Sequence, residues 1–519
     1  MTETTMQSLA DHFAEQARNQ PNAPALIWQG EPTSYGELLT LVSRMVDDLG
    51  KLDLPDDRPV GIRAKKSPHA IALILACLTI KRPFVLPSVE LAPETLEQLF
   101  AQAAASYVLS PQEHATDGST VQVDEPKGDA EPDWPPTEGA ADVSFMLTTS
   151  GSTGLPKIVP LPAQAIDRFT DWAAEQFEIG PGAKVLNYAP LNFDLCLLDI
   201  WTTLKHGGTV VLVDQDRGTN GGYVAELIRS HEVNVVQAVP MLYRLLIDVA
   251  REQQGETSGR SFSGVFSLTG GDFPSVRYVL ATGDKTPATT LKELPSLFPN
   301  ARFFNVYGCT ETNDSLMQEL ELSKGEVPTD IPVGQPLPDV EAVLVNEDGG
   351  FIEGEGTGEL VVWTPFQTHG YLKAALNEGK FASYPQNGNG DKRYFRTGDM
   401  VHRHGDGTLT LEGRADFYVK VRGVRVSTQV VEQAIQEHPD VIEVGVVAVP
   451  DELAGARLHA VVRKEPDAKL NSLTLRQHCA SRLARTEMPS GIDIVTDPLP
   501  KTSTGKIDRK RLRQERTQT

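Results

Sequence analysis

The sequence predicts an α/β protein with a large N-terminal domain of mostly parallel sheets and helices, followed by a small α+β C-terminal domain. Three observations lead to this fold class. The chain has 519 residues, about three times the length of a typical domain. Short β-branched apolar runs alternate with helical patterns between residues 185 and 239. Near Gly405 the pattern changes to the tight alternation of hairpin strands.

The first elements along the chain are a buried helix and a strand. The apolar run from Ala70 to Ile80 is too short to span a bilayer and predicts a buried helix. Val143 to Leu147 predicts a strand. Stretches rich in proline, glycine and polar residues predict loops at Asp117–Ala141, Arg251–Gly264 and Ser383–Lys392.

The middle of the chain predicts parallel βαβ units. Strands and helices are expected in turn at residues 185–190 (strand), 197–204 (helix), 209–214 (strand), 223–228 (helix) and 233–239 (strand). After the turn at Gly405 and Gly407, a helix from Ser427 to Glu437 and two apolar strands complete a small unit. We therefore predict an N-terminal core at residues 1–414 and a C-terminal domain at residues 415–519, with the boundary between Leu411 and Phe417.

Charge and cysteine usage exclude several classes of partner. The chain has 48 basic and 70 acidic residues, a net charge of −22, which argues against nucleic acid or an anionic membrane as the main partner. Residues 1–13 show no secretory signal pattern, and the four cysteines are scattered without metal-ligand spacing. These features predict a cytoplasmic protein. The basic run from Lys501 to Arg516 is either a solvated tail or an anion-handling segment.

A loop rich in hydroxyl residues and glycine follows the predicted strand at Val143. Its sequence, from Thr148 to Lys157, is TTSGSTGLPK. Backbone N–H groups, hydroxyls and a lysine at a strand end can surround a polyphosphate. The alternative is an ordinary surface turn. The loop taken alone does not favour a phosphate site over such a turn. The spacing differs from a Walker A loop, because no hydroxyl residue follows Lys157.

Four further segments, in order, give the chain a family resemblance. They are FNVYGCTETNDS (304–315), YFRTGDMV (394–401), GRADFYVKVRGVRV (413–426) and LPKTSTGKIDRKRL (499–512). Together with the loop at Thr148, they resemble the adenylate-forming superfamily of acyl-CoA synthetases, beetle luciferases and nonribosomal peptide synthetase adenylation domains. The resemblance covers nearly the whole chain and implies the family's two-domain fold, in which the small domain is mobile.

The resemblance implies a site for ATP and Mg²⁺. It places Thr149, Ser150, Gly151, Ser152, Thr153, Gly154 and Lys157 around the β- and γ-phosphates. Thr310 would contact the α-phosphate, Glu311 would hold Mg²⁺, and Tyr307 would lie against adenine. Asp399 would accept hydrogen bonds from the ribose, with Arg414 nearby. These groups would neutralise charge while a carboxylate attacks the α-phosphorus.

The C-terminal domain would supply the catalytic lysine and then rotate. Lys506 matches the lysine that bridges the substrate carboxylate and the α-phosphate, and Asp416 matches the hinge. Rotation would bring Gly423 toward a pantetheine thiol. The chain departs from the family pattern at Cys309, where proline is usual, at Arg82–Pro83, and after Val426, where only Glu432 of the usual acidic segment remains. None of these departures removes a catalytic group.

The segment LNFDLCLLDIW (191–201) resembles the amino-acid-activating branch, particularly the free-standing D-alanyl and prolyl carrier ligases. Asp194 would hold the substrate ammonium; from the residues alone, a helix N-cap is the favoured role for this aspartate. Asp199 is expected on the helix in a structural role. The other pocket positions implied by the resemblance are Leu195, Leu198, Gln237, Leu280, Thr282, Val306, Asp314 and Ser315.

These positions favour a small or medium, mostly apolar amino acid such as proline, alanine or a β-amino acid. Asp314 needs a partner, either a second amine or hydroxyl on the substrate or a neighbour such as Gln237. The expected reaction is formation of an aminoacyl-AMP, then transfer to a phosphopantetheine carrier protein supplied in trans. The alternatives are an acyl- or aryl-CoA ligase for a non-amino acid, and a degenerate homologue that only binds nucleotide or a partner.

Overall fold

The computed structural model divides the chain into two compact units. The first comprises Met1–Ala342, Val362–Arg396 and Thr408–Thr410, and the second comprises Val343–Val361, Thr397–Gly407 and Leu411–Thr519. A single boundary after residue 414 stays a prediction. The structure describes residues 8–55, 58–113, 118–136, 142–149, 155–253, 273–322, 331–346, 348–384, 392–414, 418–421, 424–451, 455–466, 468–480, 482–483, 487–501 and 507–517.

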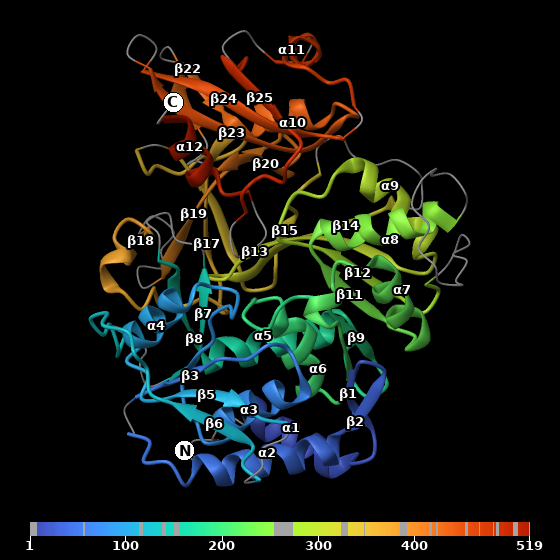
Figure 1. The fold of residues 1–519 in the computed structure, drawn as a ribbon, viewed down its shortest axis with the longest axis vertical. Helices are drawn as coiled ribbons and strands as arrows, with labels where there is room; N and C mark the ends of the chain where they lie inside the picture. Colours follow the sequence, from blue (N-terminus) through green and yellow to red (C-terminus); the bar gives the residue numbers. More distant parts are fainter. Residues whose placement is uncertain are drawn as a thin grey trace. The chain divides into compact units, whose positions relative to one another are not determined.

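A nine-stranded sheet dominates the first unit (Figure 1). In spatial order its strands are β15 (Gln335–Pro336), β14 (Asn313–Leu320), β13 (Arg302–Cys309), β12 (Tyr278–Ala281), β11 (Val235–Ala238), β9 (Lys184–Asn187), β10 (Thr209–Leu212), β1 (Pro24–Trp28) and β2 (Glu31–Ser34). The strands from β13 to β1 all pair in parallel, whereas β15, β14 and β2 are antiparallel. The predicted parallel βαβ arrangement is therefore confirmed.

A six-stranded sheet is the second large sheet of this unit. Its order is β6 (Val121–Asp124), β5 (Val108–Pro111), β3 (Val60–Ile62), β4 (Phe84–Val85), β7 (Val143–Thr149) and β8 (Lys157–Pro162). The predicted strand at Val143 is confirmed as β7. The predicted loop at Asp117–Ala141 is wrong in part, because Val121–Asp124 pairs antiparallel with β5 as an edge strand.

The helices of the first unit are α1 (Leu9–Asn19), α2 (Tyr35–Leu49), α3 (Pro68–Thr79), α4 (Pro93–Gln102), α5 (Ala163–Gln176), the π-helix η2 (Leu197–Thr202), α6 (Thr203–Lys205), α7 (Gly221–Ser230), α8 (Pro240–Gln253) and α9 (Ala288–Leu297), with short 3₁₀ turns η3 (Gln215–Arg217) and η5 (Ala374–Asn377). The predicted buried helix is α3. Ser67 caps it, Pro68 lies in its first turn, and every residue from Ala70 to Cys77 is buried. No described helix is long and apolar enough to cross a membrane.

The helices α7, α8 and α9 lie together beside β11 and β12 (Figure 1). Their apolar faces meet the sheet in a core that includes Ile228, Leu246 and Val279, all at most 1% exposed. This packing fixes the carboxyl ends of the parallel strands, where α/β sheets place their ligands.

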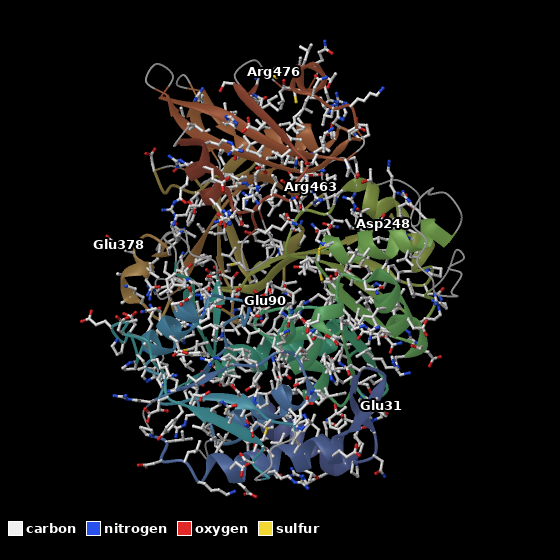
Figure 2. All side chains as sticks on the ribbon, in the orientation of Figure 1. Glu31, Glu90, Asp248, Glu378, Arg463 and Arg476 are labelled. Carbon is white, nitrogen blue, oxygen red and sulfur yellow. The ribbon has the colours of Figure 1, made fainter. Side chains whose placement is uncertain are left out.

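Charge lies mostly outside these cores. The acidic side chains of Glu31, Glu90, Asp248 and Glu378, labelled in Figure 2, come from separate segments of the first unit and are exposed. These four carboxylates are thus solvated on the surface.

A five-stranded sheet contains β16 (Glu341–Val345), β17 (Gly356–Trp363), β19 (Arg393–Arg403), β18 (Phe381–Ser383) and β20 (Leu409–Arg414), and the division between the units passes through its strands. The second unit also holds the hairpin β21 (Tyr418–Val421) and β22 (Val424–Ser427), α10 (Thr428–Gln436), β23 (Val441–Asp451), β24 (Gly455–Lys464), α11 (Ser472–Ala480), β25 (Gly491–Val495) and α12 (Arg509–Thr517). The predicted turn at Gly405 and Gly407 joins β19 to β20, and the helix predicted from Ser427 to Glu437 is confirmed as α10, which Ser427 caps.

Candidate active site

The segment predicted to contact ATP forms the hairpin between β13 and β14. Tyr307 lies near the end of β13, and Thr310 and Glu311 occupy the turn before β14 begins at Asn313. The register shifts between Tyr307 and Gly308. A Cβ on Gly308 would lie 2.3 Å from the carbonyl oxygen of Asn313, so only glycine allows the two strands to approach this closely.

Glu311 is 8% exposed, and a buried tyrosine connects it to Lys157. The hydroxyl of Tyr371 donates a hydrogen bond of 2.6 Å to Oε1 of Glu311. The Nζ of Lys157 lies 3.4 Å from the same hydroxyl oxygen and 4.5 Å from the centroid of the ring. Lys157 is the first residue of β8 and pairs with Thr149 at the end of β7. The structure thus brings together two of the predicted phosphate and metal residues.

Asp194 lies in the turn that precedes η2 and is half-buried. Burial raises the pKa of its carboxyl, a hydrogen bond from the Thr310 hydroxyl lowers it, and the charge of Glu311 raises it, with a raised pKa as the result. The helix N-cap alternative is wrong, because Cys196 holds the cap position of η2 and no side chain caps it. The predicted ammonium-binding residue therefore lies near the residue predicted to contact the α-phosphate.

Asp314 is the second carboxylate near Asp194. Burial, together with the charge of Asp194, raises the pKa of Asp314 to about 7. Its predicted neighbour Gln237 instead donates a hydrogen bond of 3.2 Å to the carbonyl of Leu195. Of the alternatives considered for Asp314, a hydrogen bond with Gln237 is therefore not the one that forms.

Four of the other predicted pocket positions lie at or near the carboxyl ends of neighbouring parallel strands. Gln237 on β11 pairs with Leu280 on β12, and Thr282 directly follows β12. Val306 lies on β13, the next strand in the sheet. Leu198, Gln237, Leu280, Thr282, Val306 and Ser315 are all buried, and Leu195 is half-buried.

The predicted helix at residues 197–204 is a π-helix followed by one α-turn. Asp199 on it is fully buried and accepts a hydrogen bond of 3.1 Å from Nδ2 of Asn187. Burial raises its pKa well above the ordinary value. The Nζ of Lys66 donates to the carbonyl of Asn187 at 3.1 Å. The predicted place of Asp199 on the helix is confirmed, and its structural role stays a prediction.

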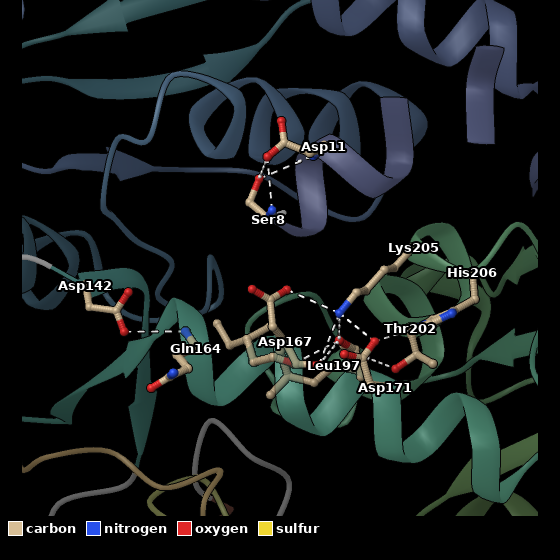
Figure 3. A network of polar contacts seen from close by, with 12 residues as sticks. Ser8, Asp11, Asp142, Gln164, Asp167, Asp171, Leu197, Thr202, Lys205 and His206 are labelled. Carbon is tan, nitrogen blue, oxygen red and sulfur yellow. Dashed lines mark hydrogen bonds and ion pairs between the residues drawn. The ribbon is translucent and has the colours of Figure 1, made fainter. Parts of the chain in front are cut away.

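A second polar network, centred on the buried Lys205, anchors the far end of the same segment (Figure 3). The Nζ of Lys205 lies 3.3 Å from Oδ1 of Asp167 and 2.8 Å from Oδ1 of Asp171, and His206 lies 3.2 Å from the same Asp171 oxygen. The side chain of Lys205 is only 1% exposed. These contacts tie the end of α6 to α5, and no pattern in the sequence pointed to them.

Asp399 and Arg414 lie in the second unit and form an ion pair of 3.0 Å. The N–H of Arg414 also donates to Oε1 of Gln429 at 3.1 Å. Gly398 has a φ of +74°, and a Cβ there would lie 3.0 Å from the guanidinium of Arg414. The predicted proximity of Arg414 to Asp399 is confirmed. The predicted residues Ser150, Gly151, Ser152, Thr153, Gly154, Asp416, Gly423 and Lys506 lie outside the described residues.

Tyr371 is the residue at this site that sequence analysis missed. It lies outside the five segments that carried the family resemblance, 60 residues after Glu311 and 214 after Lys157. Backbone contacts bring it there: the N–H of Thr368 donates to the carbonyl of Glu311 at 2.9 Å.

Known proteins are similar to this chain along nearly its whole length. The family model described as AMP-binding enzyme matches residues 13–372, and the model of its C-terminal domain matches residues 430–506. The chain is 28% identical to the D-alanine–D-alanyl carrier protein ligase of Bacillus licheniformis, over 98% of this chain and 99% of that protein. It is 28% identical to the L-proline–[L-prolyl-carrier protein] ligase of Pseudomonas fluorescens, over 97% of this chain and 98% of that protein.

The fold also matches a solved structure, o-succinylbenzoate coenzyme A synthetase from Bacillus subtilis in complex with AMP. The TM-score is 0.77 at 22% identity, over 96% of this chain and 97% of that one. The shared fold and the extent of the family match lead to one conclusion: the chain belongs to the AMP-binding enzyme family.

Proposed function

We propose that this protein joins an amino acid to AMP, using ATP, and then transfers the aminoacyl group to the phosphopantetheine thiol of a separate carrier protein. In the first step, a carboxylate oxygen of the amino acid bonds to the α-phosphorus. The bond from that phosphorus to the bridging oxygen breaks, and pyrophosphate leaves. In the second step, the thiol sulfur bonds to the acyl carbon and AMP leaves with the carboxylate oxygen.

The burial of Asp194 near Thr310 and Glu311 carries the proposal. Asp194 is a carboxylate whose charge burial disfavours, so a substrate ammonium beside it would be attracted strongly. Thr310, the residue proposed to contact the α-phosphate, lies close enough to Asp194 to lower the pKa of its carboxyl. An amino acid with its nitrogen at Asp194 would therefore present its carboxylate on the side of the nucleotide.

Several residues suit the charge changes of this reaction. The Nζ of Lys157, together with the loop of residues 149–154, would donate hydrogen bonds to the β- and γ-phosphates. The ring of Tyr307 would lie against adenine, Asp399 would accept from the ribose, and Lys506 would neutralise the charge that develops on the α-phosphate. Asp416 and Gly423 keep their proposed roles in domain rotation and thiol transfer.

The residues at Glu311 fit Mg²⁺. This ion commonly uses one or two protein carboxylates and takes its other oxygens from phosphates and water. Glu311 offers one buried carboxylate beside Lys157, with one oxygen already oriented by Tyr371. When bound, the ion would neutralise phosphate charge during the displacement.

The pocket supports a compact substrate. Leu195, Leu198, Leu280 and Val306 are aliphatic, which favours a small or medium, mostly apolar amino acid such as proline, alanine or a β-amino acid. Relatives named as carrier protein ligases along their full length support a carrier in trans as the acceptor.

Amino-acid-dependent exchange of pyrophosphate into ATP tests the proposal. A screen of proteinogenic, D- and β-amino acids should identify a substrate, and Asp194→Asn should lower its kcat/KM on the order of 10²-fold. That loss corresponds to about 3 kcal/mol, typical for truncating one side of a buried charge pair. Asp248→Asn, an exposed aspartate on α8, is the control and should leave the rate unchanged.

Two outcomes would contradict the proposal. Exchange with fatty or aryl acids only would indicate an acyl- or aryl-CoA ligase, with thioester formed on free coenzyme A. Full activity of Asp194→Asn toward an amino acid would show that this carboxylate does not bind the ammonium.

A further inference from the structure

Tyr371 occupies a place between two groups of opposite charge. Its side chain is buried, at 3% exposure, and its hydroxyl reaches Oε1 of Glu311 at 2.6 Å. Lys157 reaches the same hydroxyl oxygen at 3.4 Å and lies over the ring at 4.5 Å from its centroid. A tyrosine hydroxyl can accept from an ammonium and donate to a carboxylate at the same time. The two charges are therefore connected through a neutral group.

The backbone around Tyr371 holds it in this place. Its N–H donates to Oδ1 of Asn377 at 2.7 Å, and Nδ2 of Asn377 returns a hydrogen bond to its carbonyl at 3.2 Å. One step earlier, the N–H of Gly370 donates to the Thr368 hydroxyl at 3.2 Å. Thr368 in turn is bonded to the backbone of Glu311. These hydrogen bonds hold the loop that carries Tyr371 against the turn that carries Glu311.

This arrangement has a consequence for both charged groups. A hydrogen bond to one carboxylate oxygen fixes the plane of Glu311 and directs its other oxygen. The ring and hydroxyl together restrict Lys157, a flexible side chain whose ammonium is a compact point charge with three donors. A direct ion pair between Lys157 and Glu311 would instead satisfy each charge with the other.

We propose that Tyr371 is a positioning residue that orients Glu311 toward Mg²⁺ and Lys157 toward the phosphates of ATP. This inference rests on the proposed function. It assigns the orientation of Glu311 to the hydroxyl alone, whereas Lys157 contacts both the hydroxyl and the ring and keeps the ring contact when the hydroxyl is removed.

The two tasks can be separated by measuring ATP affinity without any amino acid, so that no turnover occurs. The dissociation constant of ATP is determined by calorimetry with Mg²⁺ and again in EDTA. Tyr371→Phe keeps the ring and removes the hydroxyl. It should reduce the Mg²⁺-dependent gain in affinity on the order of 10-fold, as for other residues that orient metal ligands. The affinity in EDTA should stay within about twofold.

Tyr371→Leu, which removes the ring as well, should weaken ATP binding in EDTA as well as with Mg²⁺. Tyr35→Phe is the matched control, because Tyr35 is fully buried and its hydroxyl donates to the carbonyl of Gly208 at 2.8 Å, away from these groups. It should change neither affinity. The melting temperature of each variant, followed by tryptophan fluorescence, checks folding.

Equal loss with and without Mg²⁺ in Tyr371→Phe would show a merely structural role and overturn the inference, as would unchanged binding in both conditions. If the wild-type protein binds no ATP in the presence of Mg²⁺, the proposed function itself fails. Wild-type binding together with an unaffected Tyr371→Phe refutes the positioning role alone.

Discussion

Replacing Asp314 by asparagine should stabilise the first unit, and more so at high pH. The pKa of Asp314 is raised to about 7 from its ordinary value of 3.8, because burial and the charge of Asp194 disfavour ionisation. An aspartate whose pKa is raised by folding stabilises the folded state fully only at pH values below its pKa in the unfolded chain. That stability is lost as the pH rises from about 4 to about 7. Asparagine keeps the shape and removes the charge.

The magnitude follows from the two pKa values. Each pKa unit corresponds to about 1.36 kcal/mol, so the advantage of asparagine has an upper limit of about 1.7 kcal/mol at pH 5 and about 4 kcal/mol at pH 8. The gap in melting temperature between the variant and the wild type should therefore widen by roughly 3 °C between these pH values.

Fluorescence is a suitable probe because all five tryptophans, Trp28, Trp134, Trp172, Trp201 and Trp363, lie in the first unit. Melting is recorded at pH 5 and pH 8 for the wild type, for Asp314→Asn and for the exposed control Asp248→Asn. A gap that is the same at both pH values would refute the reasoning, because the group that titrates would not be Asp314. A saturating concentration of the amino acid substrate should narrow the difference in melting temperature at pH 8, because its ammonium favours the ionised form of the carboxylates.

Two further perturbations test the supports of the site. Lys205→Met should lower the stability of the first unit by about 3 kcal/mol or more, because Asp167 loses its buried partner; urea unfolding followed by fluorescence measures this. Burial raises the pKa of Asp171, but hydrogen bonds from His206 and Lys205 hold it at about 2. The stability that ionised Asp171 gives the folded state should therefore be lost as the pH falls from about 4 to 2. This loss of stability at acid pH should be smaller in Lys205→Met. Gly308→Ala should cost about 1–3 kcal/mol and most of the exchange activity, since its Cβ would lie 2.3 Å from a carbonyl oxygen; Gly222→Ala on α7, whose nearest neighbour would be 3.4 Å away, is the control. A Gly308→Ala protein with wild-type melting and exchange would contradict the close-approach argument.

The family motifs and the strand–helix alternation were enough to predict the fold class, because both are local patterns. The strands β9, β10 and β11 appear where short apolar runs lie between helical segments, and α3 appears where apolar residues follow Ser67 and Pro68. The errors come from features that depend on pairing at a distance. The edge strand β6 exists because β5 offers it a partner, and its own composition resembles a loop.

By itself, the sequence determined the parallel α/β architecture, the small α+β segment at the C-terminus and the identity of the charged residues in the motifs. Periodicity and motif spacing are properties of neighbouring residues, so they can be recognised along the chain. Only the tertiary structure decided that Tyr371 joins Glu311 to Lys157, that Lys205 anchors the segment bearing Asp194, and that Gln237 turns to Leu195 rather than to Asp314. Those contacts join residues tens to hundreds of positions apart, and strand register together with burial fixes them, which no local pattern encodes.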